Sequence, residues 1–144
     1  IRPALLSGLA SWQRQPLDAG LMHSEAQCLL GEQDFSAFRA ASCQSHTPMR
    51  NVHDVAVTRW GDLVALDITA NAFLHHMVRN IAGALMAVGC GKQKPGWLGE
   101  LLAGRDRTAA ADTAAPDGLY LVAVTYGQQW GLPPAIPGPG LYPV

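Results

Sequence analysis

Apolar residues recur at helical spacing between Ala72 and about Val88, and this is the strongest pattern in the chain. On a wheel of about 100° per residue they cover one broad face, and Asn71 precedes them as a potential N-cap. The pattern predicts an amphipathic helix over this range. The remaining face carries polar or small residues within roughly 140° of one another, which we expect to point away from the core: His75, His76, Arg79, Asn80 and Gly83.

The first half of the chain predicts a helix, a loop and a β-hairpin. Asp18 caps a helix whose apolar positions continue to Leu30, where the following glycine ends it. Residues 34–48 have weak periodicity and many hydroxyl and amide groups, which favours a loop with room for one helical turn. Alternating residues at 50–59 and 63–70, joined by a Gly-Asp turn, predict two paired strands.

The second half predicts short helices and one further strand. Pro95 at a first helical position begins a helix that Gly104 ends, and another helix is expected at 108–114. The unbroken apolar run within Gly118–Tyr126 is typical of a strand covered on both faces.

Together these elements predict an α+β fold, with helices packed on one face of a mixed or antiparallel sheet. The 144 residues, 49% of them hydrophobic, suffice for one core, which we place in a domain at 1–126. Frequent prolines predict an extended surface tail at 127–144, because proline removes backbone hydrogen-bond donors. Ile1-Arg2-Pro3 carries no helix-start or strand-start signal, so we expect a chain cut from a longer one.

Composition and charge exclude several classes of protein. Ten basic and 11 acidic residues give a net charge of -1, far from the basic footprint of a stand-alone nucleic-acid binder. Cys28, Cys43 and Cys90 form no Cys-x-x-Cys pair, so neither a disulfide framework nor a zinc finger is indicated. No apolar run reaches the roughly 20 residues of a spanning helix and no signal peptide opens the chain, so we expect a soluble cytoplasmic protein.

Arg79 is the most unusual residue of the predicted helix, because a permanently charged group stands among Phe, Leu, Met, Val and Ile. If partly buried, it needs an anionic partner. That partner is either a structural carboxylate such as Asp67 or Asp54, or a carboxylate or phosphate of a functional site; a solvated rim position is a third reading. His75 and His76 diverge by about 100° on a helix and make a poor metal pair, so we predict no metal site.

The predicted loop at 34–48, here called the polar loop, and the residues that follow it offer side chains that can contact RNA, but no nucleophile. Arginine, hydroxyl and amide side chains between residues 39 and 59 can reach phosphates and ribose hydroxyls, although an ordinary solvated loop has the same composition. Cys43 and His46 are only three residues apart, and neither a Gly-x-Ser-x-Gly elbow nor a phosphate-binding glycine motif occurs. Asp106 is better explained as a helix cap or an arginine partner than as a nucleophile.

Several segments, read in order, resemble the A family of bacterial tRNA pseudouridine synthases. They are LLGEQDFSAFRA at 29–40, TPMRNV at 47–52, ANAFLHHMVRNI at 70–81, RDRT at 105–108 and GLYLVAV at 118–124. The likeness covers nearly the whole chain up to the tail, and the joint match is specific whereas each segment alone is not. It implies the C-terminal half of a pseudouridine synthase fold.

The resemblance implies an isomerase that acts on tRNA. Members of the family detach uracil from its ribose in the anticodon stem-loop, at positions thirty-eight to forty, and reattach it through carbon 5 without a metal or organic cofactor. An aspartate in an Arg-Thr-Asp-x-Gly motif starts the reaction, by attacking the nucleotide or by promoting an elimination, and a tyrosine stacks near the target base. This sequence contains neither the aspartate motif nor the sequence context of that tyrosine. We therefore expect the aspartate in a missing N-terminal catalytic domain and no activity from this chain alone.

Site residues carry over from the resemblance position by position. Arg79 matches the arginine that pairs with the catalytic aspartate, a role that its helical setting suggests independently. Leu119 and Leu121 match the apolar wall beside the flipped base. His46 replaces what is commonly an arginine, so we expect a weaker contact at neutral pH. The expected RNA-binding residues are Arg39, Ser42, Cys43, Gln44, Ser45, His46, Arg50, His75 and His76.

The resemblance also implies partners. Family members are homodimers whose tRNA groove uses both subunits, which makes the near-neutral charge understandable. Two other interpretations stay open: a stand-alone RNA-binding or dimerisation module in which Arg79 contacts phosphate, and a metabolic α+β domain in which Arg79 forms a structural ion pair.

Overall fold

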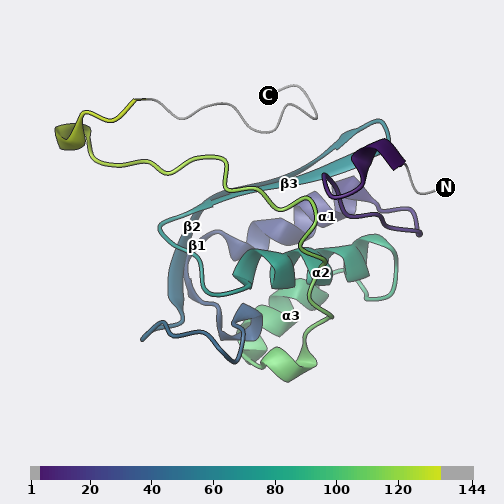
Figure 1. Cartoon of the computed structure of the whole chain (residues 1–144). Helices are drawn as coiled ribbons and strands as arrows, with labels where there is room; N and C mark the ends of the chain where they lie inside the picture. The colour runs from purple at the N-terminus through teal and green to yellow at the C-terminus, as the bar shows by residue number, and fades with distance from the viewer. Residues whose placement is uncertain (1–3, 134–144) are drawn as a thin grey trace. The chain divides into compact units, whose positions relative to one another are not determined.

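A computed structural model of the chain describes residues 4–133, which form two compact units (Figure 1). The larger unit comprises residues 13–115 and holds every strand and α-helix of the described residues. The smaller unit comprises residues 4–12 and 116–133, and its regular structure is limited to 3-10 turns at Ala4–Leu6 and Gln128–Trp130. No helix in residues 4–133 is long and apolar enough to cross a bilayer.

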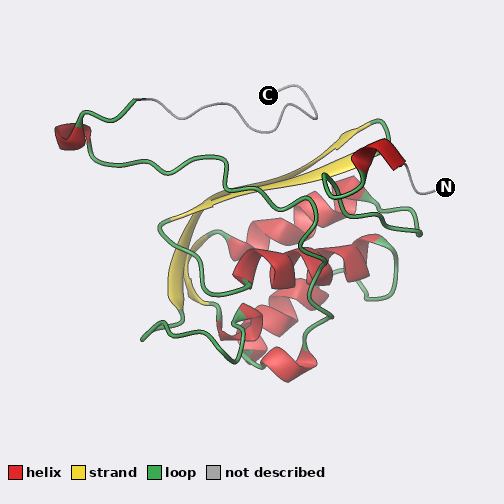
Figure 2. Cartoon of the chain, viewed as in Figure 1, coloured by secondary structure: helices red, strands yellow, loops and turns green. Residues whose placement is uncertain are grey.

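The larger unit is built on a three-stranded antiparallel sheet of order β1-β2-β3, coloured yellow in Figure 2. The predicted hairpin is confirmed and turns at Gly61, whose φ of 59° lies in the left-handed region that favours glycine. The hairpin register pairs Val55 with Ile68 and Val57 with Leu66, so these apolar side chains share one face. The strands are β1 (Gly31–Asp34), β2 (Met49–Trp60) and β3 (Leu63–Ala70).

Three helices lie against one face of this sheet, which confirms the predicted α+β arrangement (Figures 1 and 2). Asp18 caps α1 as expected, since its Oδ1 accepts a hydrogen bond of 2.9 Å from the backbone N–H of Leu21. Gly96, with a φ of 89°, is the N-cap of α3, so Pro95 lies before the helix and not at its first position. The helices are α1 (Ala19–Ala26), α2 (Met77–Gly89) and α3 (Trp97–Gly104).

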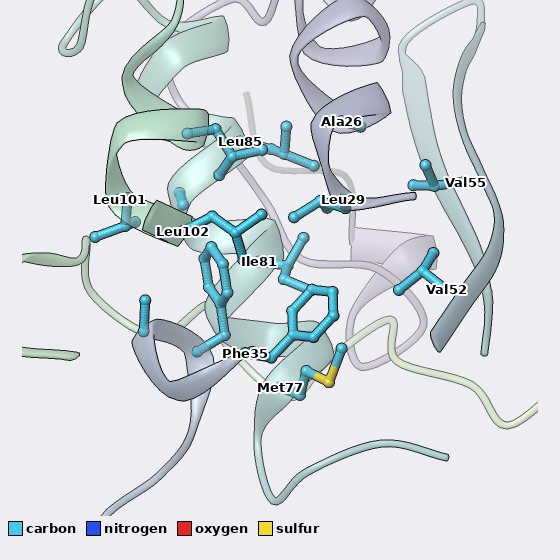
Figure 3. Packing of buried hydrophobic residues seen from close by; sticks show 14 of the residues in the cluster. Ala26, Leu29, Phe35, Val52, Val55, Met77, Ile81, Leu85, Leu101 and Leu102 are labelled. Atoms are coloured by element: carbon cyan, nitrogen blue, oxygen red, sulfur yellow. The ribbon is translucent and has the colours of Figure 1, made fainter. Parts of the chain in front are cut away.

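The core of the larger unit lies between the sheet and the helices (Figure 3). Ile81 and Leu85 of α2 are fully buried, as are Leu29 and Phe35 from the segments on either side of β1. Burial of each such side chain stabilises the fold by roughly 1.5–3 kcal/mol relative to its exposure to water. Helix α2 is therefore fixed along most of its length by apolar packing, which gives its polar residues defined positions.

Helix α2 begins at Met77, so the predicted start at Ala72 was wrong. Asn71 does not cap the helix, because its backbone N–H donates to the Asn51 carbonyl (3.0 Å) and its Oδ1 accepts from the Asn51 N–H (2.9 Å), which prolongs the pairing of β2 with β3. The helix starts only after His76, whose φ of 58° lies outside the helical region. Residues 72–76 therefore do not follow the helical wheel.

Two other predicted elements were wrong. Gly118–Tyr126 forms no strand and its apolar side chains are exposed, because an apolar run does not specify a ladder partner and the segment pairs with none of the strands in residues 4–133. The helix expected at 108–114 is reduced to a 3-10 turn at Arg107–Ala109, after which the chain is extended. Strand β1 was not predicted, since its four residues are mostly polar and lie at the edge of the sheet.

The one helical turn expected in the polar loop is the 3-10 turn Ser36–Phe38. Asp106 acts as a cap, as predicted: its Oδ1 accepts from the Thr108 N–H (2.9 Å) and from the Thr108 hydroxyl (2.7 Å). The predicted tail at 127–144 lies mostly outside the described residues, and its described part includes the turn at Gln128–Trp130. The domain limit at residue 126 stays a prediction.

Candidate functional site

Arg79, in the first turn of α2, is half-buried and anchored by backbone groups. Its Nε donates a hydrogen bond of 2.8 Å to the carbonyl of Ala114, and the Ala114 N–H donates to the Arg79 carbonyl at 3.1 Å. Its Nη1 lies 3.3 Å from Nε2 of His76. No carboxylate lies within 4 Å of Arg79 in the described part of the chain. The guanidinium therefore keeps donors for an anion that residues 4–133 do not supply.

The segment that anchors Arg79, residues 107–114, is itself fixed to α2 by a buried polar network. Asn80 is 1% exposed, and its Oδ1 accepts from Arg107 Nη2 (3.1 Å) and from the Thr113 hydroxyl (2.6 Å). Its Nδ2 donates to the Phe38 carbonyl at 2.7 Å. Asn80 thus joins three segments at one point, so its side-chain polar atoms are satisfied in a dry environment.

This network corrects the expectation for the polar face of α2. His75 and His76 are exposed as predicted, but Asn80 is buried. Gly83 also faces protein, since a Cβ there would lie 2.0 Å from the Asp112 carbonyl oxygen. The sequence pattern did not reveal this partner, because part of the segment, 108–114, was predicted as a helix, whereas it binds α2 through the Arg107 and Thr113 side chains and the backbone of Ala114.

The arginines of the polar loop brace the loop from within. Arg39 Nη2 donates to the carbonyls of Cys43 (3.2 Å) and Ser45 (2.5 Å). Arg50 Nη2 donates to the Ser45 hydroxyl (2.8 Å), and its Nη1 donates to the carbonyls of Thr47 (3.1 Å) and Met49 (2.6 Å). The guanidinium N–H groups that we expected to bind phosphates are therefore largely engaged in hydrogen bonds within the protein.

The loop residues between these braces are mostly exposed. Ser42, Gln44 and His46 are open to solvent, whereas Cys43 and Ser45 are half-buried. Of the predicted RNA-binding residues in the loop, Ser42, Gln44 and His46 are therefore the best placed to meet a large ligand directly, and His75 and His76 outside the loop are exposed as well.

The polar loop and the start of α2 meet at His75. The backbone N–H of His75 donates to Sγ of Cys43 (3.4 Å), and its carbonyl accepts from the Ala40 N–H (3.1 Å). Its ring stacks on that of His76, with centroids 4.0 Å apart and an angle of 25° between the planes. The structure thus brings the predicted loop residues 39–46 and the predicted residues His75, His76 and Arg79 into one continuous region of the larger unit.

Two titrating groups in this region have perturbed acidities. Backbone hydrogen bonds, that from His75 first and that at Ser45 next, lower the pKa of the Cys43 thiol, and the Arg39 guanidinium adds to the effect. Desolvation, followed by electrostatic interaction with His75 and then with the Arg79 guanidinium, lowers the pKa of His76. The region therefore makes the Cys43 thiol more acidic than an ordinary cysteine and makes His76 harder to protonate than an ordinary histidine.

The remaining site predictions fall elsewhere. Leu119 and Leu121 are 52% and 79% exposed and belong to the smaller unit, so their place beside a base stays a prediction. An open hollow in the larger unit is lined by residues such as Asp18, Arg59 and Gly89 and holds none of the predicted site residues. Within residues 4–133, no three His, Cys, Asp or Glu side chains gather in a group that would hold a metal.

Comparison with known proteins gives one consistent result. Residues 26–127 match the family model described as tRNA pseudouridine synthase. Proteins named tRNA pseudouridine synthase A are 60% identical in Legionella pneumophila (strain Philadelphia 1), 58% in Idiomarina loihiensis and 55% in Cronobacter sakazakii. Each alignment covers 96% of this chain but only 53%, 53% and 52% of the relatives. The chain therefore spans about half the length of the curated relatives it matches.

Proposed function

The chain belongs to the tRNA pseudouridine synthase family, and from this premise we propose that it is the C-terminal half of an isomerase of tRNA. The whole enzyme converts uridine to pseudouridine in the anticodon stem-loop, at positions thirty-eight to forty. The chain spans about half of its relatives, and it lacks the Arg-Thr-Asp-x-Gly motif expected of the catalytic aspartate. This half alone is therefore expected to be inactive.

Arg79 is the residue that this half supplies to the reaction. The observation that carries the proposal is a half-buried guanidinium fixed by the Ala114 carbonyl, with no carboxylate within 4 Å among the described residues. A carboxylate from the N-terminal half would complete an ion pair here. The cation would hold that aspartate ionised and oriented, whether the aspartate attacks the nucleotide or promotes elimination of uracil.

The polar loop is the proposed contact with tRNA. Ser42, Gln44 and His46 are exposed, and the internal bonds of Arg39 and Arg50 hold the loop in shape. Hydroxyl, amide and imidazole groups suit phosphate and ribose oxygens, and such contacts set orientation more than sequence choice. The near-neutral net charge of -1 fits an enzyme whose RNA groove is completed by other protein surface.

Further protein surface is proposed from two sources, the N-terminal half and a second subunit of a homodimer. Leu119 and Leu121 are proposed to face the flipped base once the N-terminal half is present. The enzyme is proposed to act in the cytoplasm, where a bacterial tRNA-modifying enzyme meets its substrate. No metal or organic cofactor is required for this chemistry.

The test separates catalysis from binding. The chain, with Arg79 or with Arg79→Ala, is mixed with the N-terminal half of the parent protein and assayed on unmodified tRNA. We expect the substitution to lower kcat by at least about 100-fold while KM for tRNA changes by less than about threefold, because the ion pair acts on the reacting group. Equal kcat for both chains would contradict the role of Arg79.

The alternative function is a stand-alone RNA-binding module in which Arg79 contacts phosphate. It predicts salt-dependent binding of an anticodon stem-loop by the chain alone, and loss of that binding in Arg79→Ala. Affinity that is unchanged by the substitution would count against it. The partly buried setting of Arg79 favours a specific carboxylate over a mobile phosphate, so the enzyme half is the stronger proposal.

A further inference from the structure

The guanidinium of Arg79 is held at two points, and only one of them is backbone. The Ala114 carbonyl fixes Nε at 2.8 Å, which sets the position of the side chain along the helix. One hydrogen bond at Nε does not by itself fix the orientation of the planar guanidinium, which can still rotate about that contact. The second contact, between Nη1 and Nε2 of His76 at 3.3 Å, is the one that limits this rotation.

His76 occupies a backbone conformation that brings its ring to this place. Its φ of 58° lies in the left-handed region, which a residue with a Cβ adopts at a cost of roughly 1–2 kcal/mol. It stands at the N-cap of α2 but forms no capping hydrogen bond with its side chain. The ring instead stacks on His75 and reaches Arg79. Local strain without a capping function is a feature that often marks a functional position.

We propose that His76 is a positioning residue for Arg79, in which a neutral imidazole accepts a hydrogen bond from the guanidinium and aims its remaining donors at the carboxylate partner. This inference rests on the proposed function of Arg79. Because a guanidinium has only donors, Nε2 must be the unprotonated nitrogen and the imidazole proton must be on Nδ1. A histidinium at residue 76 has no acceptor and would repel the arginine.

The groups around His76 favour the neutral form. His75 stacks on its ring and Arg79 faces its Nε2, and both disfavour a second positive charge. From the loop, Cys43 accepts a hydrogen bond from the backbone N–H of His75, and Arg39 donates a hydrogen bond to the Cys43 carbonyl. Desolvation, then His75 and then Arg79 lower the pKa of His76, so the contact is present at neutral pH and is lost as pH falls through that lowered pKa.

The first experiment uses the chain itself and needs no catalysis. Nitrogen NMR assigns the protonated nitrogen of His76 at pH 8, and the Nε and Cζ resonances of Arg79 are followed from pH 8 to pH 4.5. We expect Nε2 to lack a proton at pH 8 and the Arg79 resonances to move with the titration of His76. A proton on Nε2, or Arg79 resonances that ignore that titration, would overturn the proposal.

Matched variants separate a positioning role from a structural one. His76→Gln keeps an acceptor, His76→Leu removes it, and both face the same backbone strain. In the enzyme completed with its N-terminal half, we expect His76→Leu to lower kcat about tenfold at unchanged KM and His76→Gln to restore most of it. Equal kcat for Leu and Gln would contradict the proposal.

His75→Gln serves as the control for the stacked neighbour. It removes the electrostatic effect of the His75 ring on His76, so the pKa of His76 is expected to rise while the Arg79 contact stays. An unchanged or lower pKa of His76 would show that the two rings do not interact as the structure has them. If no completed enzyme is active, the proposed function fails, whereas the NMR titration still decides whether His76 holds Arg79.

Discussion

Gly83 offers a sharp test of how the 107–114 segment is seated on α2. Alanine within a helix normally stabilises a protein by about 0.5–1 kcal/mol relative to glycine. At Gly83, however, a Cβ would lie 2.0 Å from the Asp112 carbonyl oxygen and 3.3 Å from the Ala114 nitrogen. Both are backbone atoms that cannot rotate away, so the whole segment must shift.

The size of the effect follows from the bonds that this shift breaks. The segment is tied to α2 by the reciprocal pair between Arg79 and Ala114, at 2.8 and 3.1 Å, and by the Thr113 hydroxyl to Asn80 at 2.6 Å. Loss of two or three such bonds, at about 0.5–1.5 kcal/mol each, outweighs the gain in helix propensity. We expect Gly83→Ala to destabilise the chain by roughly 1–3 kcal/mol, or about 4–8 °C in Tm per kcal/mol for a unit of this size.

The assay is urea and thermal unfolding of the chain, followed by circular dichroism. Gly99→Ala is the matched control, since Gly99 lies in α3 and nothing stands within 4 Å of a Cβ built there. We expect that variant to be as stable as the parent or more stable by up to about 1 kcal/mol. If Gly83→Ala were as stable as Gly99→Ala, the 107–114 segment would not lie on this face of α2.

Two further predictions address the buried network and the loop. Asn80→Ala leaves the Phe38 carbonyl and the Arg107 guanidinium short of partners, so we expect a loss of about 2–3 kcal/mol by the same unfolding assay, and a loss under about 0.5 kcal/mol would contradict the network. The pKa of Cys43 is lowered by the His75 backbone, whereas partial desolvation and the Glu25 carboxylate raise the pKa of Cys28, an exposed residue, to about 11. Iodoacetamide at pH 8 should therefore label Cys43 well before Cys28 in a mass-spectrometric time course, with the difference shrinking as pH approaches 11, and equal rates at pH 8 would argue against these environments.

The elements that sequence predicts well are those whose signals are local. The Asp18 cap and the Gly61 turn act over a few residues, and the alternation of residues on either side of that turn predicted the hairpin correctly. The apolar face of α2 was also correct, because packing against a core requires a helical period. These parts suffice to identify the α+β fold.

The errors come from contacts with distant chain. Asn71 resembles a helix cap in sequence, but its backbone and side chain both bind Asn51 across the sheet. His76 gives no local sign of its left-handed φ. The apolar run after Gly118 was predicted to be a buried strand, yet it pairs with none of the strands in residues 4–133. A local apolar pattern predicts that a segment is buried, but it does not show whether the burying surface belongs to the same chain or to another.

For the candidate site, the sequence pattern identified Arg79 as unusual, but it did not identify the groups that hold its side chain in place. Its anchors are a carbonyl 35 residues away and a histidine whose ring direction depends on backbone strain. Asn80 was placed on the exposed face, although it is buried and joins three segments. Backbone carbonyls have no sequence signature, so such anchors become visible only in three dimensions.

The central claim is that this chain supplies Arg79 to a reaction whose aspartate lies in the other half of the enzyme. Pseudouridine formation in an unmodified tRNA tests it most directly, measured for the purified chain alone and after mixing with the separately produced N-terminal half. We predict no product from the chain alone and product on mixing. Product from the chain alone would mean that the catalytic group lies within these 144 residues, and the claim would be wrong.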